Sequence, residues 1–362
     1  MANYLPGVLP VLAAVRHVPV AWAGSFMTAL LLGQGLQPLA GWWADRVGGR
    51  RFVLAGVTLS TFSAALVGWV RPLPVIWGLL LLTGIGNTLF HPQAMTAART
   101  LAGRREGTSM SAFLVGGEVG RGIGPLAATV VAVHWGLSRL WLLALPLAVT
   151  WLPLWRVTPS APRRRPAVGG IHWRQHLGPA AALVGFAALR SGATYTVVTL
   201  APLIWHHRGG TLVAGAGLVT TLIGIGIVGN LGGGVVSDRL GRGAVLLGST
   251  VLTAVMLALF TAADHFWIWP TLALLGIALF ASSPVTLLMG QDIFAENPAF
   301  GSGVALGLAN GIGALMVFPL TYVAARMGYD TAIWVLVAMT VASWPLVAWL
   351  VRHRGGVRPK PA

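Results

Sequence analysis

The stretch GWWADRVGGRR, from Gly41 to Arg51, places a carboxylate, arginines and glycines between two long apolar segments. A related stretch, GVVSDRLGRG, returns at Gly234 to Gly243. Asp45 and Asp238 are separated by 193 positions (238 minus 45), and the arginine and glycine that follow each aspartate keep this offset. The recurrence indicates a duplicated unit in which a polar hairpin joins two apolar helices, as in membrane transporters built from two related halves.

Composition indicates that the chain lies in a lipid bilayer. Of its 362 residues 56% are hydrophobic and 9% are charged, so a water-soluble form would lack the polar side chains to cover its surface. The net charge of +16 lies in short segments between apolar runs of about 20 residues, the length that spans a hydrocarbon core. We therefore assign the basic charge to loops at the lipid surface and exclude nucleic acid as a partner.

The apolar runs predict an all-α membrane protein with twelve transmembrane helices in two pseudo-symmetric six-helix bundles. We place the helices at residues of about 3–15, 18–41, 52–70, 74–97, 108–133, 138–157, 177–205, 211–236, 244–263, 267–290, 301–326 and 330–351. Residues 1–157 are predicted to form the first bundle and 177–351 the second. The stretch 158–176 is predicted to be a basic cytoplasmic linker, and 352–362 a basic cytoplasmic tail.

The basic loops also predict the orientation of these helices. With both termini in the cytoplasm, 17 Lys and Arg residues lie in inside loops and the tail, and five lie outside. Positive charge favours the cytoplasmic side, so this is the predicted topology. The first apolar run, Asn3 to Val15, is too short to cross a membrane. We expect either that residues are missing upstream of Met1 or that this helix is naturally short.

Several strings are similar to those of a known family. The paired GxxxDRxG hairpins, the six-plus-six plan and the long basic central loop resemble the major facilitator superfamily over nearly the whole chain. Within it, the chain resembles the fosmidomycin resistance branch of efflux proteins through LPGVLPVL, LQPLAGWWADR, the FHP at Phe90 to Pro92, SAFLVGGEVGRGIGPLAA, ALRSGATYT, SSPVTLLMGQD and GSGVALGLANGIGAL. The resemblance implies a proton-driven antiporter of a bacterial inner membrane that exports small molecules, with fosmidomycin-like phosphonates as one candidate substrate and antibiotic resistance as one outcome.

The two hairpins carry a candidate conformational latch. Its residues are Gly41, Asp45, Arg46, Gly48 and Arg50 in the first copy and Asp238, Arg239 and Gly241 in the second. Each aspartate follows a span, where it can accept hydrogen bonds from a helix amino end or pair with arginines across the bundle interface. Such pairing would stabilise one of two bundle tilts. The alternative is a solvated loop that only sets topology. Asp292, at the end of the tenth span, is either a partner of the basic hairpins or of the loop with Arg104 and Arg105, or it is solvated.

The fifth span contains GGEVGRGIGP, which resembles the fifth-helix motif of antiporters. Gly120 and Gly124 are four apart, a spacing that permits close helix packing, and Pro125 is expected to bend the helix. Glu118 and Arg121 lie on nearly one helix face, and each would cost about 2.5–3.5 kcal/mol at the bilayer centre unless paired or facing water. We expect either a structural ion pair or a role in proton coupling or substrate contact.

Arg190 and His91 are the other candidates for the central cavity. Arg190 lies within the seventh span with no acid nearby in sequence. It either faces a cavity, where it meets a substrate anion or the carbonyl end of a helix, or pairs with Glu118 of the other bundle. His91 lies late in the fourth span and either carries a coupling proton near neutral pH or is a hydrogen-bonded packing residue. Pro92 and Pro284 occupy nearly equivalent places in the two halves and are expected to bend their helices.

No arrangement of residues in the sequence supports an enzyme. The chain has no cysteine, no Ser/His/Asp or paired-carboxylate pattern in a supporting context and no GxxxxGK[ST] phosphate loop, which excludes thiolate chemistry and argues against ATP as the energy source. We predict no metal and no cofactor. The predicted function is a secondary transporter that works as a monomer by alternating access, with protons as the coupling ion. The alternatives are an importer or facilitator of organic anions, and a non-transporting membrane receptor or lipid-handling protein.

Overall fold

The computed structural model describes residues 4–37, 39–40, 49–101, 106–158, 173–264, 266–294, 301 and 303–352. All regular structure in these residues is helical. The first half comprises α1 (Leu5–Arg16), α2 (Val20–Gln34), α4 (Gly49–Leu66), α5 (Leu73–Leu101), α6 (Glu106–Trp135), η1 (Leu137–Ala144) and α7 (Leu145–Val157). The second half comprises α8 (Trp173–His207), α9 (Leu212–Leu240), α10 (Arg242–Ala262), α11 (Ile268–Ala281), α12 (Ser283–Ile293), η2 (Val304–Leu308), α14 (Ala309–Leu315), α15 (Val317–Met327), α16 (Tyr329–Ala342) and α17 (Trp344–Arg352).

These segments form twelve helical rods in the described part of the chain, because consecutive segments continue one another at residues 137–157, 268–293, 304–327 and 329–352. Eight of the rods are long and apolar enough to cross a membrane. Of the other four, α1 and α2 are shorter within the described residues, and α4 and α6 are more polar. The predicted all-α architecture of twelve helices is confirmed.

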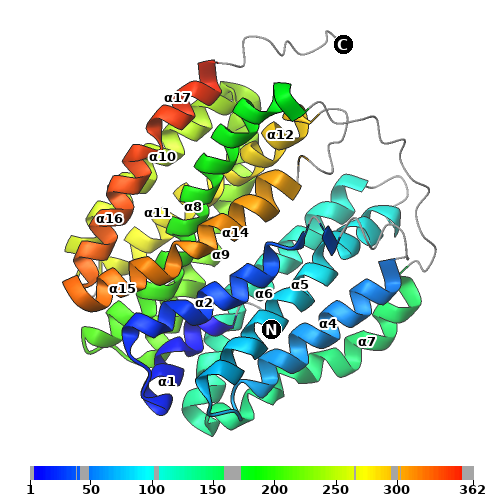
Figure 1. The fold of residues 1–362 in the computed structure, drawn as a ribbon, viewed down its shortest axis with the longest axis vertical. Coiled ribbons are helices and arrows are strands. Elements are labelled where there is room, and N and C mark those ends of the chain that lie inside the picture. Colours follow the sequence, from blue (N-terminus) through cyan, green and yellow to red (C-terminus); the bar gives the residue numbers. More distant parts are fainter. Residues whose placement is uncertain are drawn as a thin grey trace.

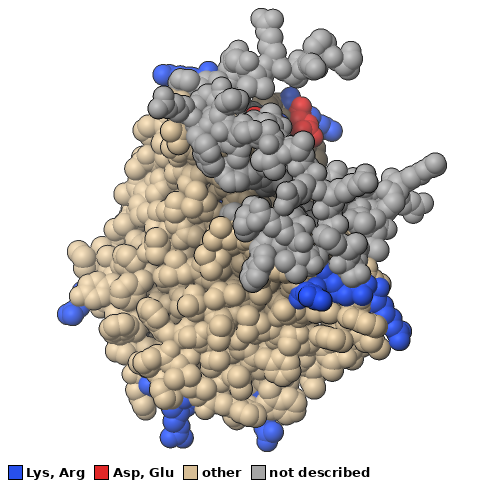
Figure 2. Space-filling view, turned by 45° about the vertical axis from the view of Figure 1, so that its right-hand side comes forward, with Lys and Arg blue, Asp and Glu red and all other residues tan. Residues whose placement is uncertain are grey.

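Apolar side chains cover the outside of the protein as well as its interior. Trp69, Trp151 and Phe266 are among many large apolar side chains that are exposed. Figure 2 shows a broad surface without charge, in tan, with Lys and Arg side chains in blue toward its ends. Soluble monomers rarely expose apolar patches larger than a few hundred Å². This surface is therefore suited to contact with lipid.

The two halves repeat one close helix contact. A Cβ atom on Gly84 of α5 would lie 2.0 Å from the carbonyl oxygen of Leu30 on α2, and a Cβ atom on Gly276 of α11 would lie 2.1 Å from that of Leu222 on α9. Gly276 follows Gly84 by 192 positions (276 minus 84), and Leu222 follows Leu30 by the same number (222 minus 30). Because a side chain would not fit at either glycine, α9 packs on α11 as closely as α2 packs on α5.

The two bundles meet mainly along α2 and α6 of the first half. In Figure 1 the first bundle, blue to green, lies at the lower right, and the second, green to red, at the upper left. α2 contacts α14 and α15, α6 contacts α9, and α1 contacts α8 and α9. Hydrogen bonds cross the interface from Thr28 Oγ1 to the Ala314 carbonyl (3.1 Å) and from Thr220 Oγ1 to the Gly122 carbonyl (2.6 Å). A site on the inner faces of these helices is therefore built by both halves.

Three rods of the second bundle are interrupted. The interruptions lie at Ser282 between α11 and α12, at Met316 between α14 and α15, and at Ser343 between α16 and α17. A proline follows within the first turn of each new segment: Pro284, Pro319 and Pro345. Proline has a fixed φ and no backbone N–H, so it begins a helix more easily than it continues one. The interruptions leave backbone carbonyls without helical donors inside the second bundle.

Candidate functional site

An ion pair on α6 forms the first part of the candidate site. Glu118 Oε1 and Arg121 Nη1 are 2.8 Å apart, and the two side chains are 16% and 31% exposed. Their spacing of three residues brings them to one helix face. The Arg121 guanidinium also lies 5.7 Å from the ring centre of Phe280 on α11, within cation–π range. A charged side chain of the first bundle therefore reaches the second bundle.

Arg190 on α8 forms the second part. Its Nη1 donates hydrogen bonds to the Leu279 carbonyl (3.1 Å) and to Ser283 Oγ (2.8 Å). The Leu279 carbonyl is available because α11 ends at Ala281, and the last four carbonyls of a helix have no partner within it. Pro284, in the first turn of α12, supplies no N–H to this region. The guanidinium thus takes the place of missing backbone donors.

The two guanidinium groups approach the same turn of α11 from different bundles. Arg190 binds the carbonyl of Leu279, and Arg121 lies over the ring of the next residue, Phe280. The alternative of an Arg190–Glu118 pair is not what forms, because Glu118 is bound to Arg121 on its own helix. In the described part of the chain, the centre therefore has two guanidinium groups and one carboxylate, and positive charge is in excess.

Tyr195 and His91 lie around the same centre. Tyr195, on α8, is within electrostatic range of Arg121, Arg190 and Glu118. His91, on α5, is within electrostatic range of Arg121. The fold thus brings the four residues that the sequence suggested for the cavity into one region, from three helices of the two bundles.

Among the residues that the structure describes, two buried atoms at this centre have no hydrogen-bond partner: Glu118 Oε2 and Arg190 Nε. The first is an acceptor and the second is a donor. A buried polar atom without a partner costs about 1–3 kcal/mol, and more where the group is charged. Native proteins leave few such atoms, and a bound solute or ordered water commonly supplies the partner. These two atoms are therefore the unsatisfied polar groups of the described centre.

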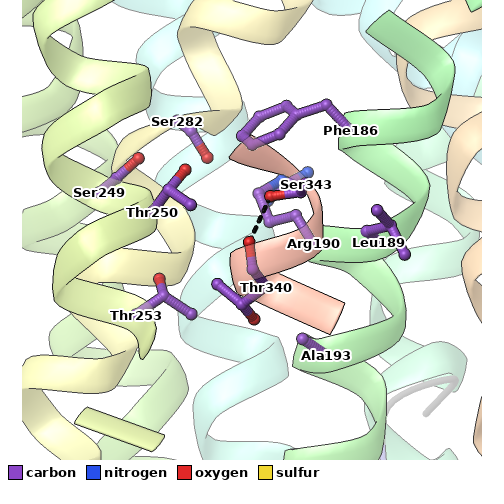
Figure 3. A pocket seen from close by; sticks show the side chains of 10 residues that line it. All are labelled: Phe186, Leu189, Arg190, Ala193, Ser249, Thr250, Thr253, Ser282, Thr340 and Ser343. Atoms are coloured by element: carbon purple, nitrogen blue, oxygen red, sulfur yellow. Dashed lines mark hydrogen bonds between the residues drawn. The ribbon is translucent and has the colours of Figure 1, made fainter. Parts of the chain in front are cut away.

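A small cavity adjoins Arg190 within the second bundle (Figure 3). Six residues with hydroxyl groups line it beside Arg190: Ser249, Thr250, Thr253, Ser282, Thr340 and Ser343. Its volume of about 20 Å³ accommodates a water molecule, and the hydroxyl groups supply the polar partners that a buried water needs. The cavity is too small for an organic substrate. We therefore assign it to hydration of the Arg190 surroundings.

The first copy of the predicted latch is only partly described. Gly41, Asp45, Arg46 and Gly48 lie outside the described residues. Arg50, at the start of α4, donates a hydrogen bond from Nε to the Thr158 carbonyl (2.6 Å), and its guanidinium lies 5.7 Å from the Trp155 ring centre. Both contacts join α4 to the end of α7. Arg50 therefore links two helices of one bundle and does not bridge the bundles.

The second copy of the latch is fully described. Asp238 and Arg239 are exposed at the end of α9, and neither forms an ion pair with any described residue. Gly241 has a φ of 82°, a left-handed conformation that favours glycine and permits the turn into α10. The ion pair of this hairpin is instead made by Arg242, which binds Asp292 at the end of α12. Of the two alternatives for Asp292, pairing with a basic hairpin is the one observed.

The glycine contact on α6 differs from the predicted one. A Cβ atom on Gly120 would meet no atom within 4 Å, so this residue makes no close helix contact. Gly122 packs across the interface instead, where an added Cβ atom would lie 3.7 Å from the Cα atom of Gly224 on α9. Residues two positions apart differ by about 200° around a helix. Gly122 therefore faces α9 from a side of α6 that does not include Gly120.

The three singled-out prolines have different surroundings. α5 continues through Pro92 and α6 continues through Pro125 without interruption, whereas Pro284 lies where α11 ends and α12 begins. The carbonyl of Pro125 is approached by α1, since a Cβ atom on Gly7 would lie 2.3 Å from its oxygen.

Sequence reasoning missed Phe280 and Tyr195 as members of the site. Aromatic residues are frequent in membrane helices, so neither carries a signal in the sequence. Ser283 is the repeat equivalent of His91, 192 positions later (283 minus 91). Its role as an acceptor for Arg190 depends on the interruption before Pro284, which repeat position alone does not predict.

A sequence profile of the Major Facilitator Superfamily matches residues 1–318 of the 362. The chain belongs to the Major Facilitator Superfamily. Members of this superfamily are secondary transporters, so the chain is a multi-pass membrane transporter and not an enzyme. The predicted superfamily is confirmed.

Two relatives within the superfamily match most of the chain. An uncharacterised MFS-type transporter of Bacillus subtilis (strain 168), YfnC, is 23% identical over 327 residues, which cover 86% of this chain and 80% of the relative. The fosmidomycin resistance protein of Escherichia coli (strain K12) is 25% identical over 320 residues, which cover 80% and 74% of the two chains. The predicted resemblance to the fosmidomycin resistance proteins is thus confirmed as a distant relationship.

Solved transporter structures share the fold of this Major Facilitator Superfamily chain. A mutant of the nucleoside transporter NupG superposes with a TM-score of 0.78 at 13% identity, covering 97% of this chain and 95% of that one. A bacterial homologue of the human lysosomal transporter Spinster, in an inward-facing and unoccupied conformation, superposes with a TM-score of 0.74 at 14% identity, covering 100% and 96%. At these identities the likeness establishes the fold alone.

Proposed function

We propose that this transporter is a proton-driven exporter of small molecules that carry an anionic group, with fosmidomycin-like phosphonates as one candidate class. The observation that carries the proposal is the excess positive charge at the centre, where Arg121 and Arg190 meet the same turn of α11 beside one carboxylate, Glu118. Guanidinium groups bind carboxylate and phosphate-like oxygens through paired N–H donors. The distant relation to a fosmidomycin resistance protein supports efflux as the direction.

In this mechanism Arg190 holds the substrate anion, and Glu118 and His91 exchange the coupling protons. The centre lies between helices of both bundles, so rocking of one bundle against the other would open it to each side of the membrane in turn. The hairpins around Asp45 and Asp238 are part of the proposal as a latch that favours one of the two tilts. Arg242 and Asp292, which pair at the second hairpin, join that latch.

The proposal includes a location in the bacterial inner membrane, with both termini in the cytoplasm and the protein acting as a monomer. The support for the topology is the distribution of basic residues, 17 in the inside loops and tail against five outside.

The test uses purified protein in liposomes with an imposed pH gradient and, on one side, a phosphonate that also carries an amino group. Proton exchange predicts that a trapped pH indicator reports proton movement opposite in direction to the phosphonate. Movement of both in the same direction would establish the importer alternative. Phosphonate binding without any movement of solute would establish the non-transporting receptor alternative.

The role of Arg190 is tested with Arg190→Ala. We expect at least about a tenfold loss of phosphonate transport, since one lost charge-assisted contact is worth about 1.5–3 kcal/mol. Arg326→Ala is the matched control, because Arg326 is exposed near the end of α15 and contacts only the Tyr322 ring among described residues. If the Arg190→Ala protein exports a cationic or neutral drug at the wild-type rate and the wild type moves no phosphonate, the anion part of the proposal is refuted.

A further inference from the structure

We infer that the substrate carries a hydrogen-bond donor, such as an amino or hydroxyl group, in addition to its anionic group, and that this donor binds Glu118 Oε2. The inference rests on the proposed function and narrows the substrate class to small amphoteric molecules, of which an aminoalkylphosphonate is the simplest example.

The first support is the pattern of occupied and unoccupied atoms at the centre. Glu118 Oε1 is bound to Arg121 at 2.8 Å, whereas Oε2 is buried without a partner. Arg190 Nη1 makes two hydrogen bonds, whereas Nε is buried without a partner. Both side chains lie within electrostatic range of Tyr195. The centre therefore offers one free acceptor and one free donor, and a ligand that satisfies both needs an acceptor and a donor of its own.

The second support is the sign of the coupling to protons. In an antiporter the substrate and the proton must exclude each other, and binding coupling is reciprocal. An anion held beside Glu118 has the opposite effect, because like charges repel and the anion favours the protonated carboxylic acid. The same anion favours protonated His91. A purely anionic substrate would therefore bind together with a proton, which gives cotransport and not exchange.

A donor on Glu118 Oε2 reverses this sign. An N–H or O–H group that binds the ionised carboxylate stabilises its charged form, so substrate binding displaces the proton. The other charged groups near Glu118 are Arg121 on the same helix, Arg190 on α8 and, through Arg121, His91 on α5. Each of these groups attracts or repels the proton on Glu118 equally in the presence and absence of substrate. They therefore do not couple proton binding to substrate binding.

The remaining helices packed against α6 bring their charged groups elsewhere. Arg16 of α1 donates to the Gly68 carbonyl (3.0 Å). Arg139 of η1 is exposed, as are Asp238 and Arg239 at the end of α9. Among the described residues around Glu118, no other group can exchange with its proton. The exchanging group must therefore come from the substrate.

The experiment compares two ligands that differ by one amino group, 3-aminopropylphosphonate and propylphosphonate. Binding to the purified full-length protein is measured by calorimetry at acidic pH, where Glu118 can carry the proton to be displaced. Two buffers with different heats of ionisation are used, so that the protons exchanged are counted. We expect 3-aminopropylphosphonate to bind at least about tenfold more tightly and to release a proton, since a hydrogen bond to a charged group is worth about 1.5–3 kcal/mol or roughly tenfold or more. Propylphosphonate is expected to bind with proton uptake.

Glu118→Gln removes the exchanging group while keeping the size of the side chain. This variant is expected to release no proton and to bind 3-aminopropylphosphonate no more tightly than propylphosphonate. Any proton exchange that it still shows comes from the phosphonate itself and is subtracted from the wild-type count. Asp330→Asn is the matched acid-to-amide control. Asp330 lies in the first turn of α16, its side chain is 67% exposed, and its Oδ1 is 3.8 Å from Arg208 Nη2. It is expected to retain both properties.

Equal affinities and equal proton counts for the two ligands on the wild-type protein would overturn the inference without any variant. Proton release that persists in a folded Glu118→Gln protein would overturn the role of Oε2. If neither phosphonate binds and a lipophilic cation does, the proposed function itself is overturned, and the inference falls with it.

Discussion

At the scale of single residues, the contacts of Arg190 allow a stability prediction. Its Nη1 bridges the Leu279 carbonyl and Ser283 Oγ, a geometry that depends on the planar guanidinium. A lysine ammonium is a point charge at the end of a flexible chain, so Arg190→Lys keeps the charge but loses at least one of the two bonds. We expect a loss of about 1–2 kcal/mol in stability, measured as a lower unfolding temperature in detergent.

Arg326→Lys is the control for this change, because Arg326 lies near the end of α15 with its guanidinium 5.5 Å from the Tyr322 ring centre. Its expected effect is within about 0.5 kcal/mol, as for other surface substitutions. Equal shifts in the two proteins would show that the bridge between α8 and the α11–α12 interruption does not stabilise the fold.

The residue scale also shows what sequence reasoning can reach. Glu118, Arg121 and Arg190 stand out in the sequence because an ionisable residue in an apolar span is costly and needs a partner. The identity of that partner was open for Arg190, since the choice between Glu118 and a helix carbonyl depends on how α8 sits against α11. Ser283, which accepts from Arg190, has no such cost, and nothing in the sequence distinguishes it from other serines in spans.

At the scale of elements, the interruption between α11 and α12 carries the second prediction. Pro284→Ala restores a backbone N–H in the first turn of α12, so α11 and α12 can join and the α11 carbonyls can find helical donors. Arg190 would then lose its carbonyl partner. We expect transport to fall at least about tenfold while the unfolding temperature stays equal or rises, because a proline that interrupts a helix costs about 3 kcal/mol.

Pro179→Ala is the control, because Pro179 lies inside α8 where the helix continues uninterrupted. It should leave transport near the wild-type rate. Transport in Pro284→Ala protein that equals the wild type would contradict a role for the interruption in positioning Arg190.

The prolines and glycines mark the limit of prediction for elements. Hydropathy located the spans, because length and apolar character are local properties of the chain. Pro92 and Pro284 were expected to act alike, yet α5 continues through the first and α11 ends before the second. Whether a membrane helix continues through a proline depends on the groups packed around it, and those neighbours are distant in sequence. Gly122 in place of Gly120 as the contact residue is a similar case, since the face of α6 that meets α9 is a tertiary property.

At the scale of the whole molecule, the duplication was readable from sequence and the way the halves join was not. The hairpins at Asp45 and Asp238 give a repeat offset of 193, and the Gly84–Leu30 and Gly276–Leu222 contacts recur at 192. Helices within one half therefore pack as their equivalents do. The interface between the halves follows the same repeat, because the Thr28–Ala314 and Thr220–Gly122 hydrogen bonds are related by the offset of 192 (220 minus 28, and 314 minus 122). Which helices meet there, such as α2 with α15, becomes visible only in the fold.

The interface between the bundles carries the last prediction, which uses the absence of native cysteine. Trp22 on α2 and Phe318 on α15 have ring centres 5.9 Å apart across the two bundles. A short bis-maleimide linker between Trp22→Cys and Phe318→Cys would hold these helices together. If transport requires the bundles to rock, linked protein in liposomes should lose at least about nine-tenths of its transport, since alternating access needs this contact to open.

A cross-link inside one bundle is the control for the loss of transport expected from the α2–α15 link. A Cβ atom on Gly243 of α10 would lie 3.7 Å from the Cβ atom of Val351 on α17, so Gly243→Cys with Val351→Cys accepts a link within the second bundle. This protein should transport at the rate of its unlinked form, because rigid-body motion leaves the pair unchanged. Loss of free thiols measures the yield of each link. Transport that survives complete linking of the α2–α15 pair would mean that the two bundles do not separate at this contact, and the carrier would need a different moving part.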